Sequence, residues 1–444
     1  MMKKNKKQLK LEDAFVPVEE QPYEVPENWC WTKLGVTISI SKEKTDDFSD
    51  TSVKYVGLEH LENNKGLSGY GTTEGIKSLK NIFHTGQILY GKLRPYLNKH
   101  DIASFDGVCS TDILVIDVKN VVDTQFVNKF LDMDSFISYT VNNSKGINLP
   151  RVSGETIMDA VFPLPPLPEQ QRIVERIKSL FSKLDEAKEK AQAVVDGFLD
   201  RKATILHRAF TGGLTKEWRE NKGVDYSDTW KMDTLGNYAN SQYGYTEKSS
   251  SKKIGPKFLR ITDIQDGQVI WKDVPYCKIN EELKETYLLN IGDIVVARTG
   301  ATTGKSYMVI DEIDAVYASY LIRISINRKD LLRSKYLYYF LQCPLYWQQI
   351  TELSSGIAQP GVNGNKLKTL QLPIPNVEEQ DKIVEILDYL APVEQKARDS
   401  AELALEQIDA MKKSILAKAF RGELGTNNPS DESSIELLKQ VIKE

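Results

Sequence analysis

Residues 162–175 read FPLPPLPEQQRIVE, and residues 372–385 repeat this pattern as LPIPNVEEQDKIVE, at an offset of 210 residues. The same offset relates Gly146-Ile147 and Val152 upstream, and Ile205-Leu206 and Ala209-Phe210 downstream, to Gly356-Ile357, Val362, Ile415-Leu416 and Ala419-Phe420. Solenoid repeats have periods of roughly 20–50 residues, so this unit is too long to be one. The sequence therefore predicts a domain followed by a helix, used twice, with an approximate internal two-fold.

The two copies suggest six segments along the chain. Short apolar runs bounded by Gly, Asn and Asp predict strands and turns before each junction, whereas residues 126–139 and 336–349 have helical spacing. The expected segments are an N-terminal arm (1–20), a first globular domain (21–165), a first long helix (166–213), a second globular domain (214–375), a second long helix (376–424) and a flexible tail with a short helix (425–444). The predicted fold class is α+β, with two pseudo-symmetric mixed domains separated by two long antiparallel coiled-coil helices.

Each long helix carries an apolar stripe at alternating spacings of four and three residues, which is typical of a coiled coil. The stripe residues expected to bind the other helix or a partner are Ile173, Ile177, Leu180, Leu184, Ile383, Leu387, Leu390 and Ile408. About 40 helical residues would extend roughly 60 Å. Pro392 should kink or restart the second helix. A plain helical hairpin buried within one domain is the alternative reading.

Composition limits the class of protein. The chain has 444 residues, 41% of them hydrophobic, and a formal net charge of −4, and no segment is strongly basic, so it is not a non-specific coat for nucleic acid. No apolar stretch reaches the 18 or so residues of a membrane helix, and the basic N-terminus leads into no apolar run. The four cysteines lie far apart, which favours reduced thiols in a cytoplasmic protein.

Motifs for catalysis are missing. Residues 300–306, GATTGKS, resemble a P-loop, but the spacing between glycines is one residue short. The four histidines show no metal-ligand spacing, and no nucleophile elbow is present. We therefore expect no catalytic residue and no metal site in this chain.

Taken together, these features resemble the specificity subunit of type I restriction–modification systems. The resemblance rests on residues 22–29 (PYEVPENW) with Leu34-Gly35, on the two Pro-rich junctions, and on the stops Ala209-Phe210-Thr211-Gly212 and Ala419-Phe420-Arg421-Gly422. The second junction departs slightly, with Asn376-Val377-Glu378 after its Pro-x-Pro.

The resemblance implies a division of labour. Each globular half would be a target recognition domain that reads one half of a split, asymmetric double-stranded DNA site. The helices would set the spacer and dock two methyltransferase subunits, which the restriction/translocase subunits join. The chain itself would hold no cofactor; S-adenosylmethionine, ATP and Mg²⁺ would act in the partner subunits. Half-sites read from one face of B-DNA have centres about one turn, or 34 Å, apart.

Basic and amide residues in the domain loops are the expected DNA contacts, because Arg favours guanine and Asn or Gln favours adenine in the major groove. The candidates are Lys92, Arg94, Lys99, Asn148, Arg151, Lys253, Lys257, Arg260, Arg298, Lys305 and Gln359, with Lys252 completing a basic cluster at 252–260. The alternative is a non-catalytic coiled-coil scaffold that binds only protein, although such a scaffold would not need two divergent domains.

Overall fold

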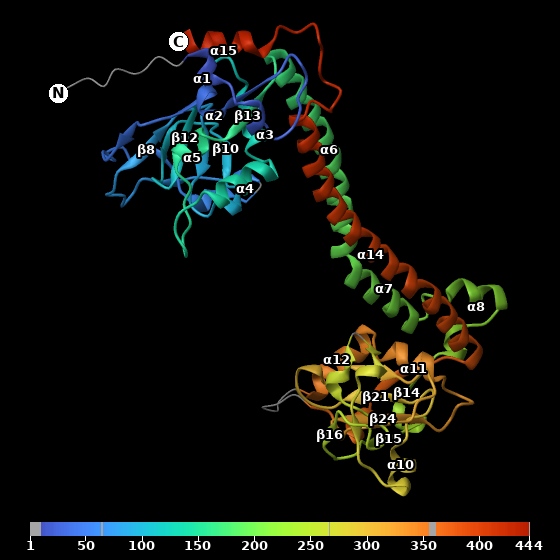
Figure 1. Ribbon diagram of the computed structural model, residues 1–444. Helices are drawn as coiled ribbons and strands as arrows, with labels where there is room; N and C mark the ends of the chain where they lie inside the picture. Colours follow the sequence, from blue (N-terminus) through green and yellow to red (C-terminus); the bar gives the residue numbers. More distant parts are fainter. Residues whose placement is uncertain (1–9, 64, 266, 355–360, 444) are drawn as a thin grey trace. The chain divides into compact units, whose positions relative to one another are not determined.

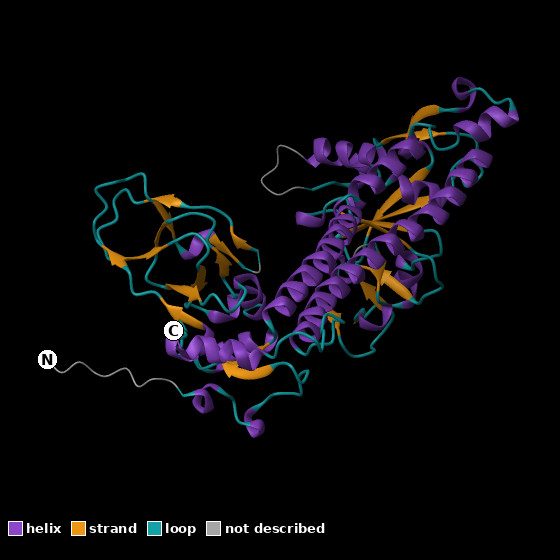
Figure 2. Cartoon of the chain, turned by 90° about the horizontal axis from the view of Figure 1, so that it is seen from above, coloured by secondary structure: helices purple, strands orange, loops and turns teal. Residues whose placement is uncertain are grey.

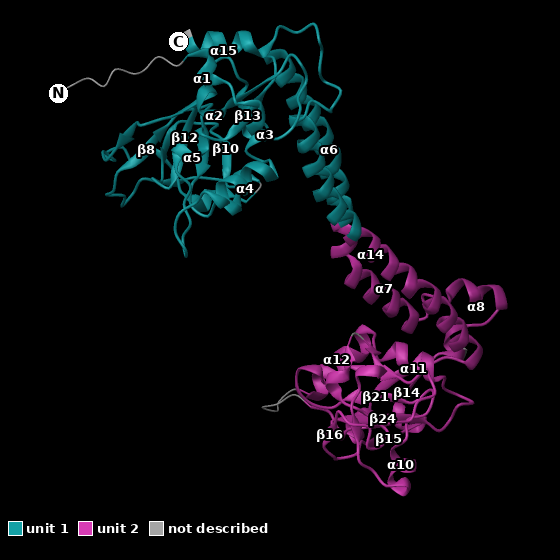
Figure 3. Ribbon diagram, viewed as in Figure 1, with its two compact units in different colours: residues 1–191, 403–444 teal, residues 192–402 magenta. Residues whose placement is uncertain are grey.

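The computed structural model describes residues 10–63, 65–265, 267–354 and 361–443 (Figure 1). The chain divides into two compact units, one made of residues 1–191 and 403–444 and the other of residues 192–402 (Figure 3). Each unit contains one mixed domain and a pair of helical segments. Residues 403–420, which are distant in sequence from the first domain, therefore complete the first unit.

The domain of the first unit contains two larger sheets, besides the two-stranded pairs β1-β13 (Cys30–Lys33 with Val161–Leu164) and β5-β6 (Leu61–Glu62 with Gly66–Leu67). The four-stranded sheet has the order β10-β9-β12-β2, from His100–Ile102, Ile88–Gly91, Ile113–Val118 and Ile38–Ile40. The five-stranded sheet has the order β3-β8-β11-β4-β7, from Lys44–Thr45, Lys80–Phe83, Gly107–Cys109, Lys54–Val56 and Gly71–Thr72. Pairing in the first sheet is antiparallel throughout, while β11 and β4 pair in parallel.

The domain of the second unit repeats this plan. Its first sheet has the order β15-β24-β21-β22, from Ala239–Tyr243, Leu321–Ile326, Ile294–Ala297 and Ser306–Met308. Its second sheet has the order β16-β20-β17-β23, from Ser249–Ser250, Tyr276–Cys277, Lys257–Leu259 and Ala315–Tyr317, with β17 and β23 parallel. The duplication read from the junctions therefore extends to the strand order of the first-named sheet and to the parallel pair of the other. That other sheet differs at its edge, where β3 pairs with β8 in the first unit and β16 pairs with β20 in the second.

Both predicted domain helices are divided in two. Residues 126–139 fall in α3 (Thr124–Phe130) and α4 (Asp134–Asn142), and residues 336–349 fall in α11 (Ser334–Phe340) and α12 (Pro344–Ser354). The expectation of one helix in each copy was wrong. Met133 and Cys343 are buried at the two corners, and in the second copy Pro344, which cannot continue a helix, begins α12.

The long helices are α6 (Leu167–Asp196), α7 (Phe198–Phe210) and α14 (Val377–Phe420), labelled in Figure 1; Figure 2 draws all helices in purple. The restart expected at Pro392 is not present, since α14 continues through it. The interruption lies instead at Gly197, where a Cβ would stand 2.7 Å from the Arg201 guanidinium. That guanidinium donates to the Val194 carbonyl at 2.9 Å and to Glu394 at 2.8 Å.

Ion pairs show that the helices are antiparallel within each unit. In the first unit, Lys188 pairs with Asp409 at 2.8 Å, and Lys412 pairs with Asp185. In the second unit, Arg201 of α7 pairs with Glu394 of α14 at 2.8 Å, and Arg398 of α14 lies over the ring of Phe198 at 5.1 Å, so the order of contacts is again reversed. Of the predicted stripe, Ile173, Ile177, Ile383, Leu387 and Ile408 are buried, while Leu180, Leu184 and Leu390 are half-buried.

The end of one long helix packs into the base of each domain. Phe420 lies 4.9 Å from the ring of Phe126 and 5.6 Å from that of Phe130. Phe210 lies in the same way against Tyr336, at 5.1 Å, and Phe340, at 5.4 Å. These pairs keep the 210-residue offset. The Ala-Phe stops are thus core residues that join helix to domain, and not only helix terminators.

The Glu-Gln pair of each junction is fully buried and hydrogen-bonded. Glu169 accepts from the Trp29 indole at 2.7 Å, and burial raises the pKa of its carboxyl group. Gln170 accepts from the Asp123 amide at 2.8 Å, as Gln380 accepts from the Arg333 amide at 2.9 Å. A buried polar group is costly unless it is paired. The repeated motif therefore has a structural role, fixing each domain to its helix.

The C-terminal tail differs from the expected flexible linker. Asn427 donates to Glu169 at 2.8 Å, and the Arg172 side chain donates to the Thr426 carbonyl at 2.9 Å. Helix α15 (Ser434–Lys443) then buries Leu438 in the core of the first unit. Among the described residues, no helix is both long and apolar enough to cross a membrane.

Candidate nucleic-acid interface

The same loop is built twice. In the first unit, β9 leads into the 3-10 turn η3 (Pro95–Leu97), and the amide of Gly91 donates to the carbonyl of Lys99 at 2.8 Å. In the second, β21 leads into η7 (Gly300–Thr302), and the amide of Ala297 donates to the carbonyl of Lys305 at 2.8 Å. We call residues 92–99 the first reading loop and residues 298–305 the second reading loop.

A segment before each long helix closes the loop from the other side. The amide of Val152 donates to the carbonyl of Lys92 at 3.0 Å, and that of Val362 donates to the carbonyl of Arg298 at 2.9 Å. In the first unit this segment is a hairpin, residues 145–151, closed by two backbone hydrogen bonds of 2.9 Å between its ends. The structure therefore places Arg151 beside the first reading loop, at the base of the hairpin that carries Asn148.

Left-handed backbone recurs at two matched positions of the reading loops. Arg94 has φ 53° where the second loop has Gly300 at φ 76°, and Asn98 has φ 42° where the second loop has Gly304 at φ 89°. An L-residue pays roughly 1–2 kcal/mol for this conformation, whereas glycine does not. Asn98 is buried and donates to Asp132 at 3.2 Å, which gives it a structural reason. Arg94 is exposed, so burial and internal hydrogen bonds do not explain why an arginine occupies this left-handed position.

Asp112 organises two of the predicted contacts. The Arg151 guanidinium donates to it at 3.1 Å, and the Lys92 ammonium lies 3.8 Å away. This hydrogen bond raises the pKa of Arg151 above its ordinary value. Two cations thus share one carboxylate at the base of the hairpin, which leaves a local excess of positive charge.

The side chains of four other candidates form hydrogen bonds to groups of the protein itself. Lys99 donates to the Leu58 carbonyl at 2.7 Å, and Lys257 donates to the Val274 carbonyl at 2.6 Å. Arg260 is held by both oxygens of Asp263, at 3.0 and 2.7 Å. Arg298 donates to the Ser319 carbonyl at 3.3 Å and lies over the ring of Tyr243 at 4.9 Å. The expected basic cluster at 252–260 is therefore partly neutralised by local partners.

Four of the remaining candidates have side chains that are free to contact DNA. Arg94, Asn148, Lys253 and Lys305 are exposed, and within the described residues their side chains have no hydrogen bond or ion pair. Gln359 lies outside the described residues. Each reading loop thus offers a cation to solvent, Arg94 in the first and Lys305 in the second.

Exposed aromatic residues near the loops were not predicted. Tyr96, in η3, is 52% exposed, and Tyr320, whose carbonyl accepts from the Arg298 amide at 3.1 Å, is 61% exposed. Ile147, at the tip of the hairpin, is fully exposed. Tyr320 follows Arg298 by 22 residues, and only the pairing of β21 with β24 brings them together. Nothing in the local sequence signals that proximity.

Within the described part of the chain, no group of three or more acidic, histidine or cysteine side chains could hold a metal ion.

The sequence profile described as "Type I restriction modification DNA specificity domain" matches the chain twice, over residues 33–195 and 227–403. The chain belongs to this family. It is a DNA specificity protein of the type I restriction–modification class rather than a catalytic subunit, and a scaffold without a DNA-reading role is not favoured.

Relatives support this assignment. The EcoDI specificity subunit of Escherichia coli is 32% identical over 218 residues, which cover 46% of this chain and 49% of that protein, so the match spans about half of its length. The MjaVIII specificity subunit of Methanocaldococcus jannaschii is 24% identical, over 91% of this chain and 95% of that protein. The HsdS subunit of Thermoanaerobacter tengcongensis has the same fold, with a TM-score of 0.66 and 21% identity, over 91% of this chain and all of that one.

Proposed function

We propose that each domain reads one half of a split DNA site through its reading loop. The observation that carries this proposal is the loop built twice, with the same backbone hydrogen bonds and different side chains. A shared frame presents the loops alike, whereas Arg94 and Lys305 stand at non-equivalent positions in them. Different side chains on a common frame would read different half-sites.

Contacts of the reading loops would divide into two kinds. Lysine acts as a point charge suited to phosphate, so Lys305 would position the second domain on the backbone. Arg94, which extends from a strained and exposed turn, is the candidate for a base edge or a narrow groove. Asn148 lies in the hairpin next to it and would add a second polar contact, with Arg151 and Lys92 supplying positive charge behind them.

The long helices would dock the partner subunits on faces other than the predicted stripe. Most of that stripe is buried within the chain. In the second unit, α14 exposes Tyr389, at 70%, and Val393, at 47%; in the first unit it exposes Leu403, at 54%, and Met411, at 49%. We propose that two methyltransferase subunits bind the helices through these residues. Methyl transfer with S-adenosylmethionine, and ATP- and Mg²⁺-dependent restriction by the restriction/translocase subunits, would reside entirely in the partners, with the complex in the cytoplasm.

Methylome sequencing tests the DNA-reading proposal. Cells would co-express the cognate methyltransferase subunit with the wild-type chain, with Arg94→Ala, with Lys305→Ala, or with Lys231→Ala, which removes an exposed lysine far in sequence from the reading loop. We expect a split, asymmetric motif with adenine methylated in each half. Arg94→Ala should relax bases in one half only, Lys305→Ala should lower methylation of all sites uniformly, and Lys231→Ala should change neither. An assembled wild-type complex that methylates no split motif would overturn the proposal.

A further inference from the structure

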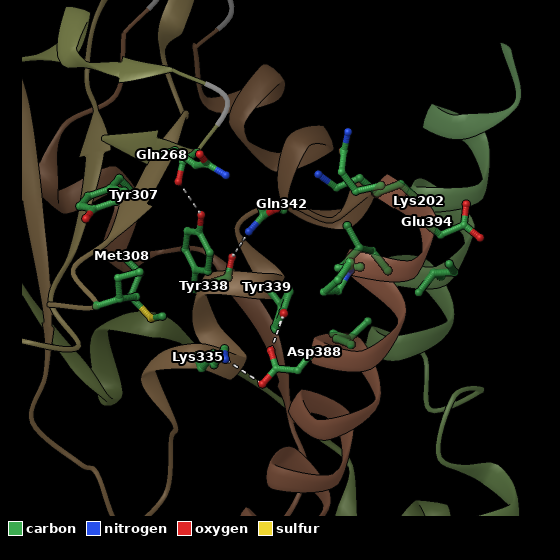
Figure 4. A pocket seen from close by; sticks show the side chains of 18 of the residues that line it. Lys202, Gln268, Tyr307, Met308, Lys335, Tyr338, Tyr339, Gln342, Asp388 and Glu394 are labelled. Carbon is green, nitrogen blue, oxygen red and sulfur yellow. Dashed lines mark hydrogen bonds and ion pairs between the residues drawn. The ribbon is translucent and has the colours of Figure 1, made fainter. Parts of the chain in front are cut away.

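The second unit contains a cavity of about 830 Å³ between its domain and its helices (Figure 4). Aromatic side chains form much of its wall, and they are Phe198, Trp271, Tyr307, Tyr338 and Tyr339. Its floor on α14 includes Ala391 and Pro392. Ligand sites are typically 300–1,000 Å³ and largely apolar with a few placed polar groups, so this cavity is of that kind.

The first unit shows what fills the matching place. There Phe181 of α6 lies between two lysines, with the Lys129 ammonium 5.8 Å and the Lys412 ammonium 5.1 Å from its ring centroid. The 210-residue offset of the two copies converts Lys129, Phe181 and Lys412 into Tyr339, Ala391 and Lys202. All three of these counterparts line the cavity. The ring at position 181 is therefore absent from the equivalent position 391, while a tyrosine stands where the first unit has Lys129.

The charges around the cavity support the same reading. In the first unit, Lys412 also pairs with Asp185, whose counterpart at the offset is Gln395. Lys202 therefore has neither a ring at position 391 nor a carboxylate at position 395 beside it, and within the described residues it has no ion pair. Asp388, in contrast, is already held by Lys335 at 2.7 Å and by the Tyr339 hydroxyl at 2.6 Å (Figure 4). Of the two lysines that line the cavity, Lys202 is therefore the one without an ion pair among the described residues.

We propose that this cavity binds a ligand through an aromatic ring, which takes the place of Phe181. The ring lies on Ala391 against Tyr339, and the Lys202 ammonium stands over its face, as Lys412 stands over Phe181. A cation within about 6 Å of a ring centroid is attracted by the ring quadrupole. The rest of the ligand lies along Trp271 and Tyr307, since the cavity is larger than one ring. The ring belongs either to a free aromatic compound or to a Phe or Tyr side chain of another polypeptide.

Binding of p-cresol to the full chain alone tests the proposal without depending on DNA reading. Saturation-transfer NMR would measure its affinity for the wild-type chain, for Ala391→Phe and for Ala410→Phe. The last is a matched control, because Ala410 is also an exposed alanine of α14 but does not line the cavity. We expect a dissociation constant on the order of 1 mM for wild type and Ala410→Phe, at least tenfold weaker for Ala391→Phe.

Phe181→Ala provides the reciprocal test, because it should open the matching place in the first unit and add a second p-cresol site. Failure of p-cresol to bind wild type, or equal binding to Ala391→Phe, would overturn the proposal. Titration of the methyltransferase subunit then distinguishes the two sources of the ring. Displacement of p-cresol from the wild-type chain by that subunit assigns the ring to the partner, whereas retention of p-cresol in the assembled complex assigns it to a free compound.

Discussion

Arg94→Gly should make the first domain more stable while weakening its binding to DNA. The two effects have separate origins. Arg94 occupies left-handed backbone at φ 53°, and the matched residue of the second domain is Gly300. Its guanidinium is exposed and makes no hydrogen bond or ion pair within the described residues, so its removal costs the fold no hydrogen bond.

The magnitude follows from two terms. Relief of the left-handed conformation contributes roughly 1–2 kcal/mol, and the greater freedom of glycine in the unfolded chain takes back about 0.4–1 kcal/mol. The net gain is about 0.5–1 kcal/mol. Loss of a base contact would cost about 1–3 kcal/mol of binding, or roughly 5–150-fold in affinity, at one position of the site. Loss of a phosphate contact would instead lower the salt slope by about 1.

Arg94→Ala separates strain from charge, because alanine keeps the strained backbone and removes the guanidinium. Fluorescence anisotropy on the specific duplex at several salt concentrations would measure binding by the assembled complex, and hydrogen exchange of the β9 and β10 amides would measure local stability. We expect equal affinity for the Gly and Ala variants, and greater protection for Gly.

Two outcomes would refute this reasoning. Wild-type affinity for both variants at all salt concentrations would show that Arg94 does not touch DNA. Lower protection in Arg94→Gly than in Arg94→Ala would show that the left-handed turn is not strained. The converse change, Gly300→Arg, meets open space and should destabilise the second domain by about 1 kcal/mol.

Two further predictions concern the cores. Burial raises the pKa of Asp132, but hydrogen bonds and charge from His100 and Lys129 outweigh it and lower the pKa to about 2. This carboxylate therefore contributes about 2 kcal/mol to the stability of the first domain above pH 4, and the contribution is lost as the pH falls from 4 to 2. In Asp132→Asn, the stability measured by hydrogen exchange of the first domain should change less between pH 4 and pH 2. A pH profile equal to that of the wild type would contradict the assignment. Phe420→Ala should lower the stability of the first unit by about 3–5 kcal/mol and expose that unit to proteolysis, whereas Phe210→Ala should expose the second unit. The same cleavage pattern from both variants would argue against separate cores.

Much of the fold could be predicted from the sequence because the two halves of the chain repeat the same sequence pattern. The two junctions set the offset, and the Ala-Phe stops at 209–210 and 419–420 fall at equivalent places in the two cores. What periodicity could not show was where an apolar run turns a corner. Met133 and Cys343 continue the helical spacing, yet tertiary packing buries each of them between two shorter helices.

The reading loops show a different limit. A lysine or arginine in a loop has the same one-letter code whether it meets solvent or a carbonyl. Lys257 was indistinguishable from Lys253 until the strands placed the Val274 carbonyl beside it. Likewise, the sequence shows Ala391 opposite Phe181 at the offset, but only the lysine contacts of Phe181 reveal what the substitution leaves open.

Comparison of the two copies is therefore the strongest internal evidence about function. Where both copies keep a residue type, as with the buried Glu-Gln pairs and the core Phe210 and Phe420, the fold accounts for it. Where they differ on an identical backbone, packing does not explain the choice. Gly300 shows that the turn closes without a side chain, so the arginine at position 94 carries a conformational cost that the fold does not require. A residue that strains its own backbone and makes no hydrogen bond or ion pair within the described residues fits the proposed contact with DNA, and the Gly and Ala variants of Arg94 test that proposal.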